Sequence, residues 1–124
     1  MKFRTAAAAL LFCFLPVPPA QAEDAADWAA GVGESYRITA DLVYSTANGY
    51  ENKLDLYLPR ERSDPGPTLV YIHGGGWVSG AKETSVLRLL PYLRLGMNVV
   101  NVEYRLARYS LAPGAVADCR CALR

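Results

Sequence analysis

The residues best suited to chemistry are three consecutive glycines, Gly74 to Gly76, which stand between His73 and Trp77. Because glycine lacks a Cβ and tolerates positive φ, such a segment can turn its backbone N–H groups toward a ligand. At the carboxyl end of a buried strand, two such groups can bind a phosphate or the oxyanion of a tetrahedral intermediate in acyl transfer. The same composition also suits a tight turn that serves packing alone. The glycines themselves leave these three interpretations open.

A phosphate-binding loop is the weaker of the two chemical interpretations. Residues 75–82, GGWVSGAK, superficially resemble the G-x-x-x-x-G-K-[ST] loop of nucleotide hydrolases. The spacing fails because Ala81 separates Gly80 from Lys82, and Glu83 stands where a hydroxyl would bind magnesium. The residues therefore favour acyl transfer over phosphate binding.

Acyl transfer also needs a nucleophile, and the 124 residues offer none. A serine hydrolase places its nucleophile in a G-x-S-x-G elbow, with a histidine within hydrogen-bond reach as base. The sequence contains no G-x-S-x-G, and its single histidine, His73, belongs to the glycine loop. The serines are interpreted as ordinary turn or surface hydroxyls: Ser35, Ser45, Ser63, Ser79, Ser85 and Ser110.

The overall composition, 52% hydrophobic and 20% charged, is that of one globular domain or part of one. Thirteen basic and twelve acidic residues give a formal charge of +1, and no run of Lys or Arg could neutralise a series of phosphates. Nucleic acid is therefore not expected as a partner. A single histidine excludes sites built from several imidazoles, so we expect no metal and no cofactor.

Residues 1–22 have the three-part pattern of a secretory signal peptide. Lys2 and Arg4 precede an apolar run over residues 6–15, and residues 20–22 form the small-residue A-x-A cleavage pattern. Prolines end the run well short of the roughly 18 to 20 residues that a membrane-spanning helix needs, so no stable membrane anchor is expected. We expect an exported protein, periplasmic or extracellular, whose mature chain begins at Glu23.

The first half of the mature chain predicts a hairpin. Residues 23–35 lack sustained periodicity and are expected to form an exposed leader. Residues 36–44 and 53–58 alternate between apolar and polar side chains, and residues 47–50 carry an Asn-Gly turn signal between them. These segments predict an antiparallel hairpin with one solvent-facing side. The proline-rich residues 59–67 then run over the surface.

The next segments predict a parallel strand-helix-strand unit. Residues 68–72 form a continuous apolar run, which is typical of a strand buried on both faces. A helix is expected over residues 83–95, with Pro91 as a candidate kink and Gly96 just past its end, and a strand over residues 97–104. The apolar side chains with helical spacing are Val86, Leu89, Leu90 and Leu93. This order indicates a right-handed crossover and an α/β fold.

A second helix is predicted over residues 113–124, with Pro113 in its first turn and an apolar side formed by Val116, Cys119 and Leu123. Cys119 and Cys121 would point to nearly opposite sides of this helix, so we expect free thiols. No glycine, asparagine or proline closes the helical pattern at its end. We therefore expect the chain to be a fragment of a larger domain.

Four short segments, in order, carry a resemblance to a known family. They are residues 54–59 (LDLYLP), 70–80 (VYIHGGGWVSG), 104–107 (YRLA) and 117–119 (ADC). Together they resemble the first half of an α/β-hydrolase esterase, within the hormone-sensitive-lipase-like and bacterial feruloyl-esterase-like groups that share an HGGGW motif. The resemblance covers residues 36–124, which it identifies as a partial α/β-hydrolase domain. It implies a secreted carboxylic-ester hydrolase with a Ser-Asp/Glu-His triad and a small-molecule ester substrate.

The resemblance also implies roles for residues of the glycine loop. Gly75 and Gly76 would be the backbone donors of the oxyanion hole, and Gly74 would allow the turn. His73 would orient the loop through hydrogen bonds and would not be the catalytic base. Trp77 would pack beneath the loop or line an acyl pocket. Asp118 would have a solvated or capping role. It would not be the triad acid, which lies much further along the chain in this family.

The sequence thus predicts the amino-terminal part of an α/β-hydrolase fold, incomplete, in which a hairpin leads into a parallel strand-helix-strand unit. Nucleophile, acid and base would all be absent, so the chain as given is expected to be inactive. An alternative is a non-enzymatic binding module that holds an acyl or aromatic ligand with the glycine loop and Trp77.

Overall fold

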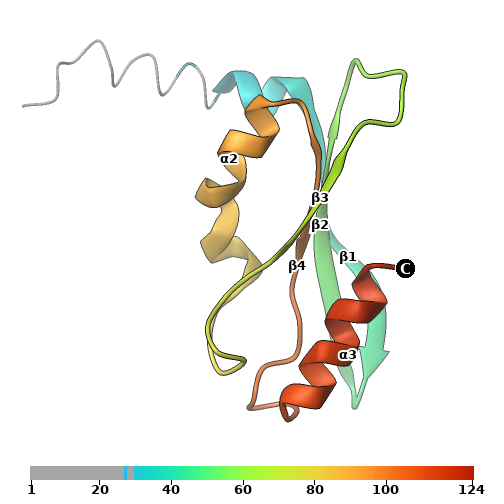
Figure 1. Ribbon diagram of the computed structural model, residues 1–124, viewed down its shortest axis with the longest axis vertical. Helices are drawn as coiled ribbons and strands as arrows, with labels where there is room; N and C mark the ends of the chain where they lie inside the picture. Colours follow the sequence, from blue (N-terminus) through green and yellow to red (C-terminus); the bar gives the residue numbers. More distant parts are fainter. Residues whose placement is uncertain (1–26, 28–29) are drawn as a thin grey trace, which may run out of the picture.

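The computed structural model describes residue 27 and residues 30–124. They form a four-stranded mixed sheet in the order β1-β2-β4-β3, with helices α2 and α3 on its two sides (Figure 1). The elements are β1 (Tyr36–Ala47), β2 (Tyr50–Pro59), β3 (Thr68–Ile72), the 3-10 turn η1 (Lys82–Ser85), α2 (Val86–Arg94), β4 (Asn98–Val102) and α3 (Ala112–Ala122). The predicted signal peptide, residues 1–22, lies outside the described residues. Among those described, no helix is long and apolar enough to cross a membrane.

The predicted hairpin is confirmed. β1 and β2 pair antiparallel, and the chain turns at Asn48 and Gly49, whose φ values of 54° and 74° are those of a type I′ turn. The pairing shifts register between Thr39 and Leu42, where Asp41 has a φ of 58°. β1 is exposed over most of its length rather than on one side alone, because it is an edge strand.

The parallel strand-helix-strand unit is also confirmed. β4 pairs parallel with β3 and antiparallel with β2, so the hairpin and the crossover share one sheet. The predicted burial of β3 on both faces is wrong for this chain, because only the face toward α2 packs against a core cluster and the strand is half-buried at most. Leu69 and Tyr71 pack against the core on the α2 side, whereas Ile72 is 38% exposed.

Helix α2 begins later than predicted and runs through Pro91. Leu89 and Leu93 are buried against the sheet, while Val86 is partly exposed. The helix ends at Arg94, and Gly96, two residues later, has a φ of 72°. Backbone N–H groups of Gly96 and Met97 donate to the carbonyls of Leu93 and Tyr92, at 2.9 and 3.2 Å. These two bonds form a Schellman motif, which explains why glycine stands at the predicted helix end.

Helix α3 presents a different face from the one predicted. Ala115, Asp118 and Cys119 are buried, whereas Val116 and Leu123 are exposed. The inward face is therefore shifted around the helix, because burying Asp118 against the sheet side fixes the rotation. Among the described residues Cys119 and Cys121 are free thiols, as expected, with Cys119 buried and Cys121 half-buried.

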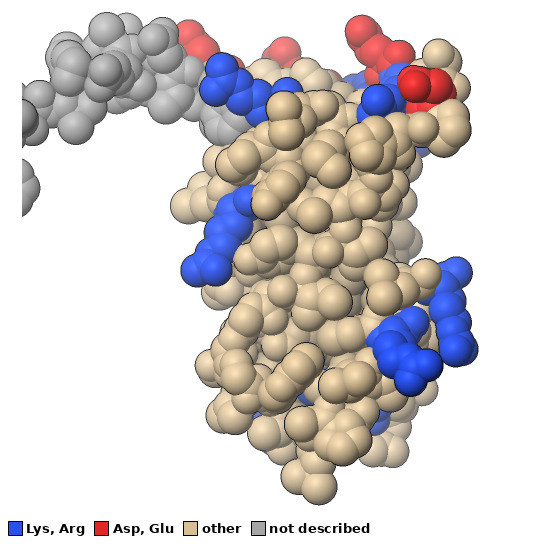
Figure 2. All heavy atoms as spheres, in the orientation of Figure 1, with Lys and Arg blue, Asp and Glu red and all other residues tan. Residues whose placement is uncertain are grey.

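The two helices cover two small cores. On the α2 side the cluster consists of Tyr36, Tyr57, Leu89, Leu93 and Val99. On the α3 side it consists of Tyr104, Leu106, Ala115 and Cys119. The described part of the predicted leader, residues 30–35, is mostly exposed but helical, and Val32 packs against the first core. Figure 2 shows few charged side chains over the middle of the viewed face.

Candidate active site

The glycine loop runs from the carboxyl end of β3 to the start of η1, and its backbone is unusual at four positions. Gly75, Gly76, Trp77 and Gly80 have positive φ, of 127°, 60°, 67° and 111°. A Cβ at Gly75 would collide with the carbonyl oxygen of Ser79. Gly74, expected to allow the turn, has no positive φ and has open space around it. The need for glycine therefore lies at Gly75, Gly76 and Gly80.

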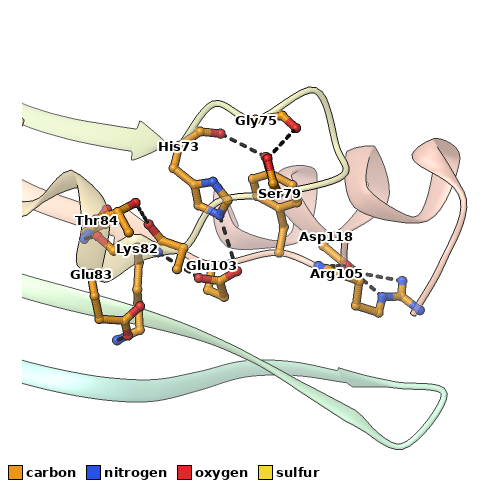
Figure 3. A network of polar contacts seen from close by, with 12 residues as sticks. His73, Gly75, Ser79, Lys82, Glu83, Thr84, Glu103, Arg105 and Asp118 are labelled. Carbon is orange, nitrogen blue, oxygen red and sulfur yellow. Dashed lines mark hydrogen bonds and ion pairs between the residues drawn. The ribbon is translucent and has the colours of Figure 1, made fainter. Parts of the chain in front are cut away.

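Hydrogen bonding inside the loop uses its carbonyls and leaves amides available. The carbonyl of Gly75 accepts from the N–H groups of Val78 and Ser79, both at 3.1 Å, and from the Ser79 hydroxyl at 3.3 Å (Figure 3). Within residues 30–124, no group accepts a hydrogen bond from the N–H of Gly74, Gly75, Gly76 or Trp77, and all four residues are exposed. Gly75 and Gly76 are thus two of four consecutive backbone donors without a partner in the described chain.

His73 is buried at the start of the loop. Its Nδ1 lies 2.8 Å from the carbonyl oxygen of Gly74, and its Nε2 lies 3.3 Å from Oε1 of Glu103. The imidazole stacks on the ring of Tyr104 at 4.4 Å, and the Tyr104 hydroxyl donates to the His73 carbonyl at 2.9 Å. Burial alone would lower the pKa of His73, but the bonds to Glu103 and Gly74 outweigh it and raise this pKa above 6.5.

An ionic cluster lies at the other end of the loop, with Lys82 and Asp55 buried and Asp41 and Glu83 exposed. The ammonium of Lys82 contacts carboxylate oxygens of Asp55, Asp41 and Glu83, at 2.8, 3.0 and 2.9 Å. Desolvation would lower the pKa of Lys82, but hydrogen bonds to these three carboxylates raise it well above its usual range. Lys82 is therefore held as a cation, 5% exposed, between the sheet and η1.

Residues following β4 form hydrogen bonds and ring contacts with the glycine loop. The N–H of Lys82 donates to Oε2 of Glu103 at 2.8 Å, and the N–H of Ala107 donates to the carbonyl of Trp77 at 2.8 Å. The Trp77 ring meets the Tyr104 ring edge-on at 5.3 Å and is 38% exposed. Trp77 thus packs partly onto Tyr104 and keeps part of its surface free.

Asp118 is neither solvated nor a helix cap, which corrects the expectation. Its two carboxylate oxygens accept from Nε and Nη2 of Arg105 at 2.7 and 2.8 Å, and one also accepts from the Arg105 N–H at 3.2 Å. Both side chains are at least 92% buried. The bidentate pair ties the segment after β4 to α3 (Figure 3).

The sequence analysis missed Glu103 and the role of Lys82. The available signals were an acidic residue directly after the apolar run of β4 and a lysine directly after the loop. A pocket of about 220 Å³ lies between the loop and the start of α2. It is lined by His73, Gly74, Gly75, Thr84, Ser85 and Arg88.

Comparisons with known proteins decide the family. Residues 54–124, which run from β2 through the loop to α3, match the BD-FAE family. This chain belongs to the BD-FAE family. The BD-FAE chain is 39% identical over 67 residues to a kynurenine formamidase of Danio rerio, covering 54% of the chain and 22% of that relative. It is 32% identical over 89 residues to a probable isoprenylcysteine alpha-carbonyl methylesterase of Oryza sativa subsp. japonica, covering 70% of the chain and 20% of that relative.

A solved structure agrees in fold. A bacterial heroin esterase superimposes with a TM-score of 0.58 at 34% identity, covering 86% of the BD-FAE chain and 35% of that structure. The resemblance to α/β-hydrolase esterases is thereby confirmed, as is the incomplete α/β-hydrolase fold. The chain spans about a fifth of the length of the two curated relatives.

Proposed function

We propose that this BD-FAE chain supplies the oxyanion-hole loop of an exported serine carboxylesterase. The observation that carries the proposal is the pair of adjacent N–H groups, on Gly75 and Gly76, without a partner in the described chain. Both lie in a backbone conformation that favours glycine, at the carboxyl end of a parallel strand. Similarity to a probable methylesterase and to a heroin esterase supports a small-molecule ester as substrate.

In ester hydrolysis the two amides would donate to the oxygen that becomes negative as the nucleophile adds to the carbonyl. Removing one such donor typically costs on the order of 100-fold in rate, about 3 kcal/mol, because the charge develops mainly in the transition state. The remaining donor is the N–H after the nucleophile, in an elbow that residues 1–124 do not contain. His73 is engaged at both ring nitrogens and would support the loop rather than take a proton from a nucleophile.

The 124-residue chain itself should not hydrolyse esters, because it has no elbow serine and no free base. We expect its rate with 4-nitrophenyl acetate to equal the buffer blank. The variant His73→Gln controls for background hydrolysis by the imidazole and should give the same rate. A rate that a serine-directed fluorophosphonate abolishes would contradict the proposal.

The same preparation tests export, since protein from the exported fraction should have the mass of residues 23–124.

The alternative of a non-enzymatic binding module is favoured by one observation, the exposure of part of the Trp77 ring beside the two unpartnered amides. It differs from the esterase in needing no nucleophile at all. The coding DNA after codon 124 separates the two proposals, as described in the Discussion.

A further inference from the structure

Both ends of the glycine loop are bonded to a single carboxylate. One oxygen of Glu103 contacts Nε2 of His73, where the loop begins, and the other accepts from the N–H of Lys82, where it ends (Figure 3). The Glu103 side chain is 13% exposed and directly follows β4. Its position is therefore determined by the sheet rather than by the loop.

We propose that Glu103 is the positioning residue of the glycine loop, and that the beginning of the loop keeps its contacts to both Gly74 and Glu103 only while His73 carries a proton on each ring nitrogen. We call the contacts of Glu103 with His73 and with the Lys82 N–H the clamp. The role of the clamp in catalysis rests on the proposed function. The clamp itself is a property of the described residues and can be measured without any substrate.

The requirement for two ring protons follows from what the imidazole contacts. Nδ1 faces the carbonyl oxygen of Gly74 and Nε2 faces the Glu103 carboxylate. Both groups only accept hydrogen bonds, so both ring nitrogens must donate, and only the imidazolium has two donors. A neutral ring would lose either the contact to Gly74 or the contact to Glu103.

The segment around Glu103 is held rigidly. The Tyr104 hydroxyl bonds the His73 carbonyl, the Ala107 N–H bonds the Trp77 carbonyl, and Arg105 is paired with Asp118 of α3. The loop therefore lies on a fixed support formed by residues 103–107. Loss of one His73 proton would remove one of the two ring contacts at the beginning of the loop, next to Gly75 and Gly76, while its support stays in place.

Several charged groups surround His73. Glu103 bonds it directly, Glu83 of η1 also raises its pKa, and Arg88 of α2 lines the same pocket. The ammonium of Lys82 contacts the carboxylates of Asp55, Asp41 and Glu83. The raised pKa of His73 implies a stabilisation that is complete below about pH 6.5, the unfolded value. That stabilisation is lost as the pH rises through the higher folded pKa.

The test uses the fact that the chain has one histidine, so an untagged sample gives a single imidazole in ¹⁵N NMR. In the wild-type chain at pH 6, we expect both ring nitrogens to be protonated and the titration midpoint to lie above 6.5. Glu103→Gln keeps the shape and one acceptor for the Lys82 N–H but removes the charge. It should lower the His73 midpoint by about one unit or more. Glu61→Gln, an exposed carboxylate elsewhere, is the matched control and should leave the midpoint unchanged.

Amide exchange supplies the second readout. The Lys82 N–H should stay protected in Glu103→Gln and exchange at least tenfold faster in Glu103→Ala, which leaves it without an acceptor. A neutral wild-type ring at pH 6, or an unchanged midpoint in Glu103→Gln, would overturn the clamp. If a variant fails to fold, the wild-type spectrum alone is sufficient to test the clamp. None of these results depends on ester hydrolysis, so failure of the clamp is distinct from failure of the proposed function.

Discussion

Replacing Asp118 by alanine should lower the free energy of unfolding by about 3 to 5 kcal/mol, since one partner of a buried ion pair is removed and the other is left uncompensated. The guanidinium of Arg105 would keep its place beneath the loop support without the two carboxylate contacts at 2.7 and 2.8 Å. Domains of this kind are stable by about 5 to 15 kcal/mol. We therefore expect this substitution to remove a large share of the stability of the chain.

Urea unfolding followed by circular dichroism measures this effect. Arg120→Ala, an exposed change on the same helix, is the matched control and should stay within about 0.5 kcal/mol of wild type. The double variant Arg105→Met with Asp118→Leu should recover much of the loss, because neither charge is then buried alone. An unfolding midpoint for Asp118→Ala equal to that of Arg120→Ala would show that the ion pair does not hold the segment.

Gly75→Ala should be the most damaging single change within the glycine loop. Gly75 has a φ of 127°, and the added Cβ would collide with the Ser79 carbonyl oxygen. Backbone strain and overpacking each cost about 1 to 3 kcal/mol, so we expect a loss of at least about 2 kcal/mol and a displaced loop. In the proposed esterase the displaced amide would no longer face the oxyanion.

Gly74→Ala is the matched control for this change, because it adds the same methyl group one residue earlier. Gly74 has no positive φ and no atom near the added Cβ, so stability should change by less than about 0.5 kcal/mol. Unfolding in urea and the amide spectrum of the loop test both variants together. Equal behaviour of the two would mean that the loop conformation described for Gly75 is wrong.

Local signals predicted most of the fold. An Asn-Gly pair sets the hairpin turn because both residues accept positive φ, and Gly96 ends α2 because a Schellman motif needs that conformation. The apolar runs of β3 and β4, with a helical pattern between them, were sufficient to predict the parallel crossover. Each of these features depends on residues close together in the chain.

The parts that could not be predicted depend on distant partners. The inward face of α3 follows from Asp118 meeting Arg105, and the partial burial of β3 follows from the packing of one of its faces against the α2 side. The clamp at Glu103 joins residues that are 21 and 30 positions apart, so no local pattern indicates it. Glycine composition predicted the loop, but which glycine needs positive φ was visible only in the structure.

We propose that the glycine loop serves an oxyanion formed at a serine outside residues 1–124. The most direct test is the sequence of the coding DNA after codon 124, translated in all three frames. We predict a strand followed by a G-x-S-x-G elbow, with an aspartate or glutamate and then a histidine further along in the same frame. Coding DNA without such an elbow in any frame would contradict the esterase account.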